Sequence, residues 1–441
     1  MIDFADWPDY KRYEKIVLPY LLGAVRRFFG CVVRFDSRPI VGVKMHHGID
    51  ILENVNRGVY VVDDGKTVIL LGRILQEEEV KAAFSLILTG SYFSGLEKLL
   101  NNFEAALALT LSSAAIKKLV VKPQQFGDDL VELTIAKHFG KGSFDHRYIQ
   151  YLIRLFGQLS TTQFEGRGFT TGLVLTRSLH AFSKKSDQER QGDLYPLVGG
   201  STLSPINQLD KRFWYLADGQ TSFFVANKQL KISNLFVVDS SRQSLGSFVD
   251  DYTLSKTIKG SDVLFRVTSQ SEFSIVGSEG VEFNYKENGW RVRDLNKIAA
   301  VIRATLGVDE PFVQSLLYYI LYLSRRRLSS IIWIPIDMDS VNSLLLSDNS
   351  FTRKPLSIMS ERHTQTLLRI LSSDGASVFT RQGDLVSYGS HIDISKKPVK
   401  GVKGTGETVA ALLAENGLAI KISQDGRIKM FSDSIAGPLV I

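Results

Sequence analysis

Two short stretches near the end of the 441-residue chain have residue types that could handle phosphate groups. The first is Asp374-Gly375-Ala376, which places a carboxylate on a predicted tight turn. Such a carboxylate can hold a divalent metal ion and can help to remove a proton from a hydroxyl group. The second is Gly404-Thr405-Gly406-Glu407-Thr408, where Thr405 is expected to cap a helix. Because free N–H groups at a helix start can bind an anion, the two stretches together predict a nucleotide site.

These two stretches can meet only if a sheet and its helices bring them together, and the sequence from Asp294 onward has that texture. Apolar residues recur at helical spacing before Gly307, and Asp309 can cap a second helix with Pro311 in its first turn. The apolar segment 329–337 lacks strict alternation, which is typical of a buried strand. We expect helices at 295–306, 309–327, 361–371 and 405–416, and strands at 329–337, 376–380, 385–392, 418–423 and 427–431. Helices alternating with strands predict an α/β arrangement of sheet and helices.

Residues from about 295 to 435 resemble the diadenylate cyclase domain, and the match covers about a third of the chain. Members of that family condense two ATP molecules into cyclic di-AMP, with each ATP held by one of two facing domains. The family hallmarks are an Asp-Gly-Ala turn, a Gly-Thr-Arg-His-Arg-Ala-Ala helix start and a strand that ends in Ser-Glu. Here Asp374-Gly375-Ala376 matches the first hallmark, and Ser423-Gln424 stands at the third. The order and the spacing of the three pieces agree with the family.

The helix start departs from the family pattern, because Gly406-Glu407-Thr408 stands where the family has Arg-His-Arg. In the family, the two arginines neutralise the triphosphate and the charge that develops on the leaving pyrophosphate. Their loss, together with the gain of a carboxylate, changes the local charge by three units against a triphosphate. Removal of a single preorganised contact to the transition state already costs about 10²–10³ in rate. We therefore expect the synthesis of cyclic di-AMP to be absent or very slow.

The resemblance implies a nucleotide site and leaves three functions open. We expect nucleotide or cyclic-dinucleotide sensing, with the signal passed to or from the N-terminal regions. The first alternative is an active cyclase, in which Asp374 is catalytic and binds Mg²⁺ or Mn²⁺, and in which Lys396, Lys397, Lys400 and Lys403 supply relocated positive charge. The second alternative is a structural or dimerisation module, and a homodimer through this domain is a further expectation. The expected binding residues are Asp374, Gly375, Ala376, Gly404, Thr405, Gly406, Glu407, Thr408 and Ser423.

The length of the chain predicts two or three domains, and we expect three within the α/β class. Residues 1–185 read as a mixed α/β domain whose role the sequence does not indicate, with two helices expected between 77 and 118. Residues 183–193 contain no apolar side chain and predict a linker. Residues 194–290 read as a β-rich domain with short apolar runs between turns. Residues 294–441 are the diadenylate-cyclase-like domain, a mixed sheet flanked by helices.

The composition and the motifs of the chain argue against two classes of partner, nucleic acid and membranes. The net charge is +7, and no zinc-finger, basic-zipper or RNA-recognition pattern supports binding to nucleic acid. The first residues lack a secretory signal, and the best apolar run, 105–116, is well short of the roughly 20 residues that span a bilayer. We therefore expect a cytoplasmic protein without a membrane partner. The single cysteine, Cys31, lies in an apolar run and is expected to be buried and inert.

Overall fold

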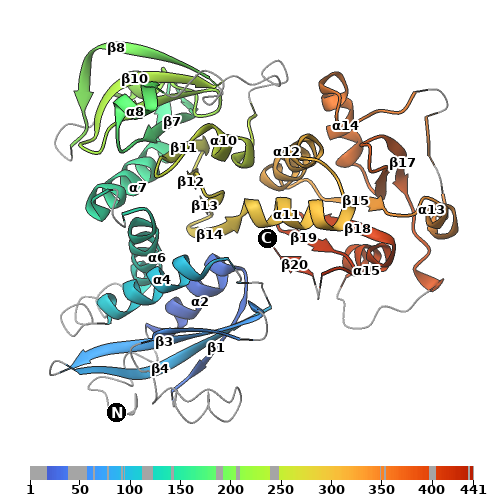
Figure 1. The fold of residues 1–441 in the computed structure, drawn as a ribbon, viewed down its shortest axis with the longest axis horizontal. Coiled ribbons are helices and arrows are strands. Elements are labelled where there is room, and N and C mark those ends of the chain that lie inside the picture. Colours follow the sequence, from blue (N-terminus) through green and yellow to red (C-terminus); the bar gives the residue numbers. More distant parts are fainter. Residues whose placement is uncertain are drawn as a thin grey trace. The chain divides into compact units, whose positions relative to one another are not determined.

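The computed structural model has a mixed α/β fold with several sheets flanked by helices (Figure 1). The structure describes residues 17–37, 57–62, 65–76, 79–90, 93, 95–111, 123–140, 144–184, 192–204, 209–238, 248–347, 349–351, 354–396, 404–435 and 438–440. The chain divides into two compact units. Unit 1 comprises Met1–Val237, Ile258–Ser278 and Glu282–Arg293, and unit 2 comprises Val238–Thr257, Glu279–Val281 and Asp294–Ile441. The division into three domains stays a prediction.

Unit 1 begins with a four-stranded antiparallel sheet in the order β1-β4-β3-β2. Its strands are β1 Val32–Asp36, β2 Val59–Val62, β3 Thr67–Gln76 and β4 Glu79–Thr89, and the helices α2 Leu18–Phe29, α4 Glu97–Thr110 and α6 Pro123–Gly140 accompany them. Helix α2 ends at Gly30, whose φ of 62° lies in the left-handed region that favours glycine. The phenyl rings of Phe28, Phe29 and Phe103 pack together between α2 and α4.

The prediction of two helices between residues 77 and 118 is wrong in its first half, because residues 79–89 form strand β4. This strand is central in its sheet and pairs with both β1 and β3. All residues from Phe84 to Leu88 are buried, and four of these five residues are apolar, so the sequence shows no strict period of two. Strand pairing overrides the intrinsic helix preference of alanine, lysine and leucine in this segment. The second helix is present as α4.

The remainder of unit 1 is an eight-stranded sheet in the order β14-β13-β12-β11-β7-β9-β10-β8. Its strands are β7 Thr171–Leu175, β8 Gly192–Thr202, β9 Ser222–Ala226, β10 Lys231–Val238, β11 Val263–Ser269, β12 Glu272–Gly277, β13 Val281–Lys286 and β14 Gly289–Asp294. The other elements are α7 His146–Thr161, the short pair β5 Gln163–Phe164 and β6 Arg167–Gly168, α8 Leu179–Lys184 and α9 Lys211–Trp214. Helix α10 Asp251–Thr257 belongs to unit 2. Strand β7 precedes the predicted linker, yet it lies between β11 and β9 in the sheet. Residues 185–191 of that linker lie outside the described residues.

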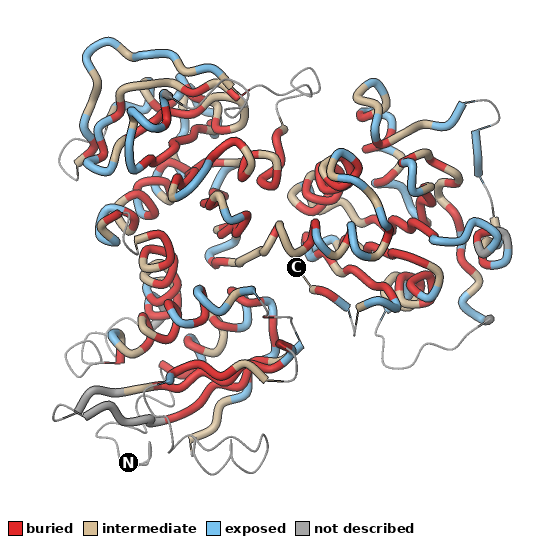
Figure 2. Tube along the Cα trace, viewed as in Figure 1, coloured by how far each residue is buried: buried red, intermediate tan, exposed pale blue. Residues whose placement is uncertain are grey.

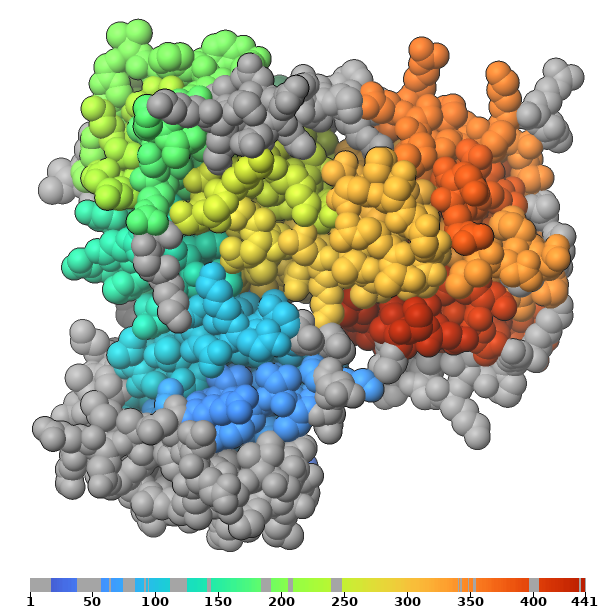
Figure 3. All heavy atoms as spheres, in the orientation of Figure 1, coloured from blue at the N-terminus to red at the C-terminus, as the bar shows by residue number. Residues whose placement is uncertain are grey.

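Unit 2 contains a six-stranded mixed sheet in the order β17-β16-β15-β18-β19-β20. Its strands are β15 Ser330–Pro335, β16 Ala376–Phe379, β17 Leu385–Ser390, β18 Gly417–Ile422, β19 Ile428–Phe431 and β20 Leu439–Val440. The helices are α11 Leu295–Leu306, α12 Glu310–Arg326, α13 Asp339–Leu344, α14 Thr364–Leu371 and α15 Thr405–Leu413, with the 3₁₀ turns η5 Glu361–His363, η6 Ile394–Lys396 and η7 Ala414–Asn416. Residues from α11 onward form a closely packed body, coloured yellow to red in Figure 3.

Every residue of strand β15 is buried (Figure 2). These residues divide between two cores. Ile332 and Ile334 pack in one core with residues of α11, α12 and α14. Ile331 and Trp333 pack in the other core with residues of α13 and α15. Apolar side chains on both faces explain why the sequence of this strand shows no alternation.

The expected cap of α12 is present, and α11 is capped in the same way. The Asp294 carboxylate accepts a hydrogen bond from the Lys297 N–H, and the Asp309 carboxylate accepts one from the Phe312 N–H. Helix α11 ends at Gly307, which has a left-handed φ of 65°. Such local signals determine where these helices begin and end, and thereby which residues face the two cores.

Candidate functional site

The candidate site lies at one end of the central strands β16, β15 and β18 in the six-stranded sheet of unit 2. Strands β15 and β16 run parallel, and Ala376 is paired with Ile331. Strand β18 runs antiparallel to β15, so its last residues lie at the end of the sheet where β15 and β16 begin. There Lys421 is also paired with Ile331. Strand β19 continues the row, because Lys429 is paired with Lys421. Directly paired residues project from the same face of a sheet, so Ala376, Lys421 and Lys429 share one face.

The Asp374-Gly375 turn lies at this end of the sheet and immediately precedes β16. Gly375 has a φ of +90°, and a Cβ atom there would lie 2.5 Å from the carbonyl carbon of Gly389 in β17. Only glycine fits this position without strain, since an L side chain would meet both an unfavourable backbone conformation and the neighbouring strand. The Gly375 N–H donates a hydrogen bond to Asp374 Oδ1 at 2.9 Å, and the Asp374 side chain is exposed. Ala376 is buried as the first residue of β16.

Helix α15 begins beside the same end of the sheet, although its cap differs from the prediction. Gly404, with a φ of 97°, is the N-cap, and Thr405 is the first helical residue. The prediction of Thr405 as the N-cap is therefore wrong by one residue. The Thr408 N–H and hydroxyl both donate to the Gly404 carbonyl oxygen, at 3.1 and 3.0 Å. This closes the first turn of the helix around Gly404 and commits the hydroxyl proton of Thr408.

Lys421 lies between the two stretches that the sequence singled out. Its side chain crosses Gly406, because a Cβ atom at that glycine would lie 2.9 Å from Lys421 Cε and 3.1 Å from Nζ. Its ammonium group donates a hydrogen bond to Ser329 Oγ at 2.8 Å. Burial lowers the pKa of Lys421, and the carboxylates of Asp374 and Glu407 partly offset this effect. Both carboxylates thus act on one ammonium group.

Glu407, in the first turn of α15, is held by a second lysine. Its Oε1 atom lies 2.5 Å from Lys429 Nζ, and both side chains are largely buried. The sequence analysis treated Glu407 as a carboxylate without a partner that would repel phosphate, and this pair neutralises it. Glu407 also separates two like charges, because Lys421 and Lys429 stand directly opposite each other on β18 and β19.

The remaining predicted site residues belong to the end of β18 and to the start of α15. Ser423 follows Lys421 at the end of β18, and its carbonyl oxygen accepts from the Gly426 N–H in the turn to β19. Gly404 and Thr405 are exposed. Lys397, Lys400 and Lys403 of the proposed lysine loop lie outside the described residues, as does the side chain of Lys396.

Ser329, Lys421 and Lys429 were not among the residues predicted for the site. A usable signal was present, because each lysine interrupts an apolar strand segment, Leu-Ala-Ile-Lys-Ile in β18 and Ile-Lys-Met-Phe in β19. A lysine inside such a strand must either point to solvent or find partners beneath a covering element. Only the register of the hairpin and the position of α15 decide between these two cases.

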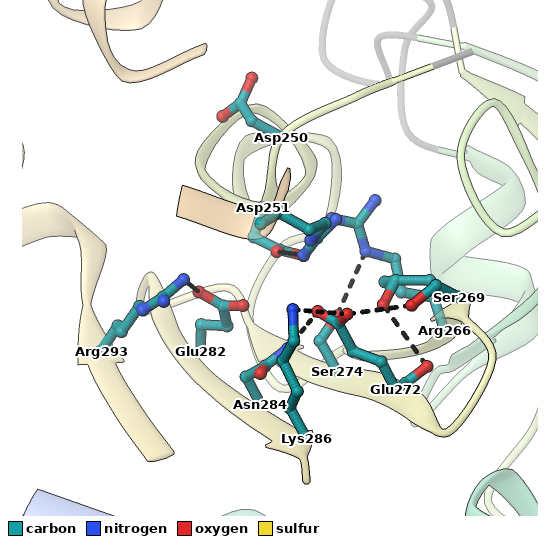
Figure 4. Close-up of polar contacts among 12 residues, drawn as sticks. Asp250, Asp251, Arg266, Ser269, Glu272, Ser274, Glu282, Asn284, Lys286 and Arg293 are labelled. Carbon is teal, nitrogen blue, oxygen red and sulfur yellow. Dashed lines mark hydrogen bonds and ion pairs between the residues drawn. The ribbon is translucent and has the colours of Figure 1, made fainter. Parts of the chain in front are cut away.

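A second cluster of polar side chains lies in unit 1, on one face of strands β11 to β13 (Figure 4). The Glu272 carboxylate accepts a hydrogen bond from Asn284 at 3.4 Å and lies 3.2 Å from Lys286 Nζ. The buried Arg266 donates to Ser274 Oγ at 3.2 Å, and these two residues are paired across β11 and β12. Because these contacts join donors to acceptors and opposite charges, we assign this cluster a structural role.

Two further searches concern metals and membranes. In the part of the chain that the structure describes, no group of three or more histidine, cysteine, aspartate or glutamate side chains could hold a metal ion. None of the helices described is long and apolar enough to cross a membrane.

Comparisons with known proteins give two structural likenesses. No protein-family model matches the chain, and no curated protein matches it significantly. A hypothetical membrane spanning protein from Bacillus cereus is 19% identical with a TM-score of 0.24, and the match covers 29% of this chain and 61% of that chain, about three fifths of its length. A double mutant of DacA from Staphylococcus aureus is 16% identical with a TM-score of 0.21, over 29% of this chain and 84% of that chain. Because both TM-scores are low, the function proposed for this chain is based on its own residues.

Proposed function

We propose that unit 2 binds a nucleotide or a cyclic dinucleotide, and that the protein senses this ligand instead of synthesising it. The observation that carries the proposal is the position of Lys421, whose side chain lies against Gly406 of α15. Ile331 of β15 is paired both with Lys421 and with Ala376, which follows the Asp374 turn. Asp374 and Gly406 come from stretches about thirty residues apart, and the resemblance assigns both stretches to one nucleotide site. Their convergence on one lysine at one end of the sheet supports a common site.

The charges around this end of the sheet favour binding over catalysis. Lys421 and Lys429 are balanced by Asp374 and Glu407, so these four groups carry no net positive charge. Transfer of a nucleotidyl group from ATP depends on positive charge that stabilises the triphosphate and the leaving pyrophosphate. At the start of α15, Gly406, Glu407 and Thr408 stand where the family has Arg-His-Arg. A ligand with fewer charges than a triphosphate suits this arrangement better.

Most of the predicted site residues have a proposed role at this end of the strands. Asp374 and Gly375 would contact the ligand, with the buried Ala376 anchoring their turn in β16. Thr405, Gly406 and Thr408 would meet the polar edge of the ligand through hydroxyl and N–H groups. Ser423 would add a contact from the end of β18. Asp374 would hold Mg²⁺ or Mn²⁺ only together with phosphate oxygens of the ligand, because one carboxylate supplies too few of the oxygen ligands that these ions require.

The test is calorimetry of the full chain with AMP, ATP and cyclic di-AMP, with and without Mg²⁺, followed by a search for products after incubation with ATP and Mn²⁺. We expect binding of at least one of the less charged ligands and no cyclic di-AMP formation. Robust conversion of ATP that is abolished by Asp374→Asn would show an active cyclase and refute sensing alone. Absence of binding at millimolar concentration would leave the structural or dimerisation module.

A further inference from the structure

We infer that Lys421 is the cation with which this site recognises a phosphate group, and that Gly406 is present to make room for it. The inference rests on the proposed function, because it names the residue and the ligand group for the same site. It predicts a ligand that places one singly charged phosphate at Lys421, such as the phosphodiester of a cyclic dinucleotide or the phosphate of a nucleoside monophosphate.

The first argument is steric. Gly406 lies inside helix α15 and has no positive φ, so its backbone conformation does not require glycine. Glycine weakens a helix relative to alanine, so another reason must account for it. That reason is space, since a single added carbon would lie 2.9 Å from Lys421 Cε and 3.1 Å from Nζ. Any side chain at Gly406 must displace the flexible end of Lys421.

The second argument concerns the partners of the two lysine ammonium groups. A lysine ammonium group has three N–H donors. Within the described residues, Lys421 Nζ makes one hydrogen bond, to Ser329 Oγ, and no ion pair with a carboxylate at contact distance. Lys429, by contrast, is ion-paired with Glu407 at 2.5 Å. Both ammonium groups retain N–H donors, but Glu407 already neutralises the charge of Lys429. The only described partner of Lys421 is the neutral hydroxyl of Ser329, so Lys421 is the lysine whose charge is available to a ligand.

The third argument concerns the charge of the ligand. Lys421 lies in the field of two carboxylates, Asp374 at the turn before β16 and Glu407 in the first turn of α15. Because Lys429 neutralises Glu407, Lys421 can pair with one phosphate charge, whereas the further charges of a triphosphate would face the Asp374 carboxylate. The geometry therefore favours a phosphodiester or a monophosphate at this position.

The experiment compares two lysine variants in the full chain. Lys421→Met keeps the aliphatic stem over Gly406 and removes the charge. We expect Lys421→Met to weaken binding of AMP and of cyclic di-AMP by about 10–100-fold, the usual effect of losing a charged hydrogen bond. Binding of adenosine, which has no phosphate, should change by less than about threefold. Because Lys429→Met alone would leave the Glu407 carboxylate unpaired beside Lys421, the control is the double variant Lys429→Met/Glu407→Gln, which leaves the net charge unchanged and should weaken binding of the phosphate ligands far less than Lys421→Met does.

A second measurement does not depend on the variants. Acetic anhydride labels exposed amines, and mass spectrometry reports the labelling of each lysine. Saturating cyclic di-AMP or AMP should protect Lys421 and leave the labelling of Lys429 unchanged. Gly406→Ala should retain a folded protein, as judged by circular dichroism, and should weaken both ligands because it displaces the Lys421 ammonium group.

The outcomes separate this inference from the proposed function. If AMP or cyclic di-AMP binds the parent chain and Lys421→Met binds it equally well, the inference is wrong and the proposed function stands. If ATP binds more tightly than both of these ligands, the single-phosphate preference is wrong. If none of the three ligands binds the parent chain at millimolar concentration, the proposed function fails and takes the inference with it.

Discussion

Replacement of Gly375 by alanine tests whether the turn that carries Asp374 is held rigidly against β17. The substitution adds one carbon to a residue whose φ is +90°, next to the backbone of Gly389. The cost has two parts. An L residue in the left-handed region costs about 1–2 kcal/mol, and forcing a carbon against packed neighbours costs about 1–3 kcal/mol more. We therefore expect Gly375→Ala to lower the free energy of unfolding by about 2–5 kcal/mol.

Gly307→Ala is the matched control. Gly307 also has a positive φ, +65°, but no atom lies within 4 Å of the position that its Cβ would take. Only the backbone term of about 1–2 kcal/mol applies there. The difference between the two variants isolates the contact with Gly389. Both glycines belong to unit 2, so the same unfolding transition reports on both.

Urea denaturation of the full chain, followed by tryptophan fluorescence, measures the two free energies. Trp333 is fully buried in the six-stranded sheet and provides a probe in unit 2. Hydrogen exchange of the peptides that contain β16 and β17 adds a local measurement, because the contact joins the start of β16 to β17. If the two variants lose equal stability and hydrogen exchange in β17 is unchanged, the backbone around residue 375 relaxes readily to accommodate the added carbon. Asp374 would then not be held in a defined position.

Three further predictions concern groups outside the site. Burial raises the pKa of Glu132 to about 7, so the folded state prefers the protonated form and its stability falls as pH rises from about 4.5 to 7. Glu132→Gln should therefore be about 1–3 kcal/mol more stable than the parent at pH 8 and equal to it at pH 4. An equal difference between the two proteins at both pH values in urea denaturation would contradict this. Asp251 and Arg325 form a buried ion pair at 2.6 Å, so Asp251→Ala should cost about 3–5 kcal/mol, and Arg325→Met in that background should recover part of the loss in the same assay. Burial raises the pKa of the Cys31 thiol to about 12, so Ellman's reagent at pH 8 should label it only in urea, and rapid labelling of the folded chain would show that the thiol is accessible.

Local sequence signals were sufficient where neighbouring residues decide the structure. Asp294 and Asp309 cap the helices that follow them, and Gly307 ends α11, because a capping hydrogen bond or a left-handed φ involves only a few consecutive residues. The Asp374-Gly375 turn belongs to the same class, since the positive φ of Gly375 is a property of that turn. The α/β class also followed from the alternation of helical and strand-like segments.

The tertiary structure decided what residues far apart in the chain do to one another. Residues 79–89 form a central strand and not the expected helix, because β1 and β3 provide partners on both edges. Glu407 looked like an isolated carboxylate in the sequence, but the register of β18 and β19 places Lys429 against it and Lys421 beside Gly406. Strand register and helix placement follow from burial over the whole unit, which no short window of sequence contains. For this reason the sequence by itself located the two stretches of the candidate site, whereas the lysine that lies between them emerged only from the fold.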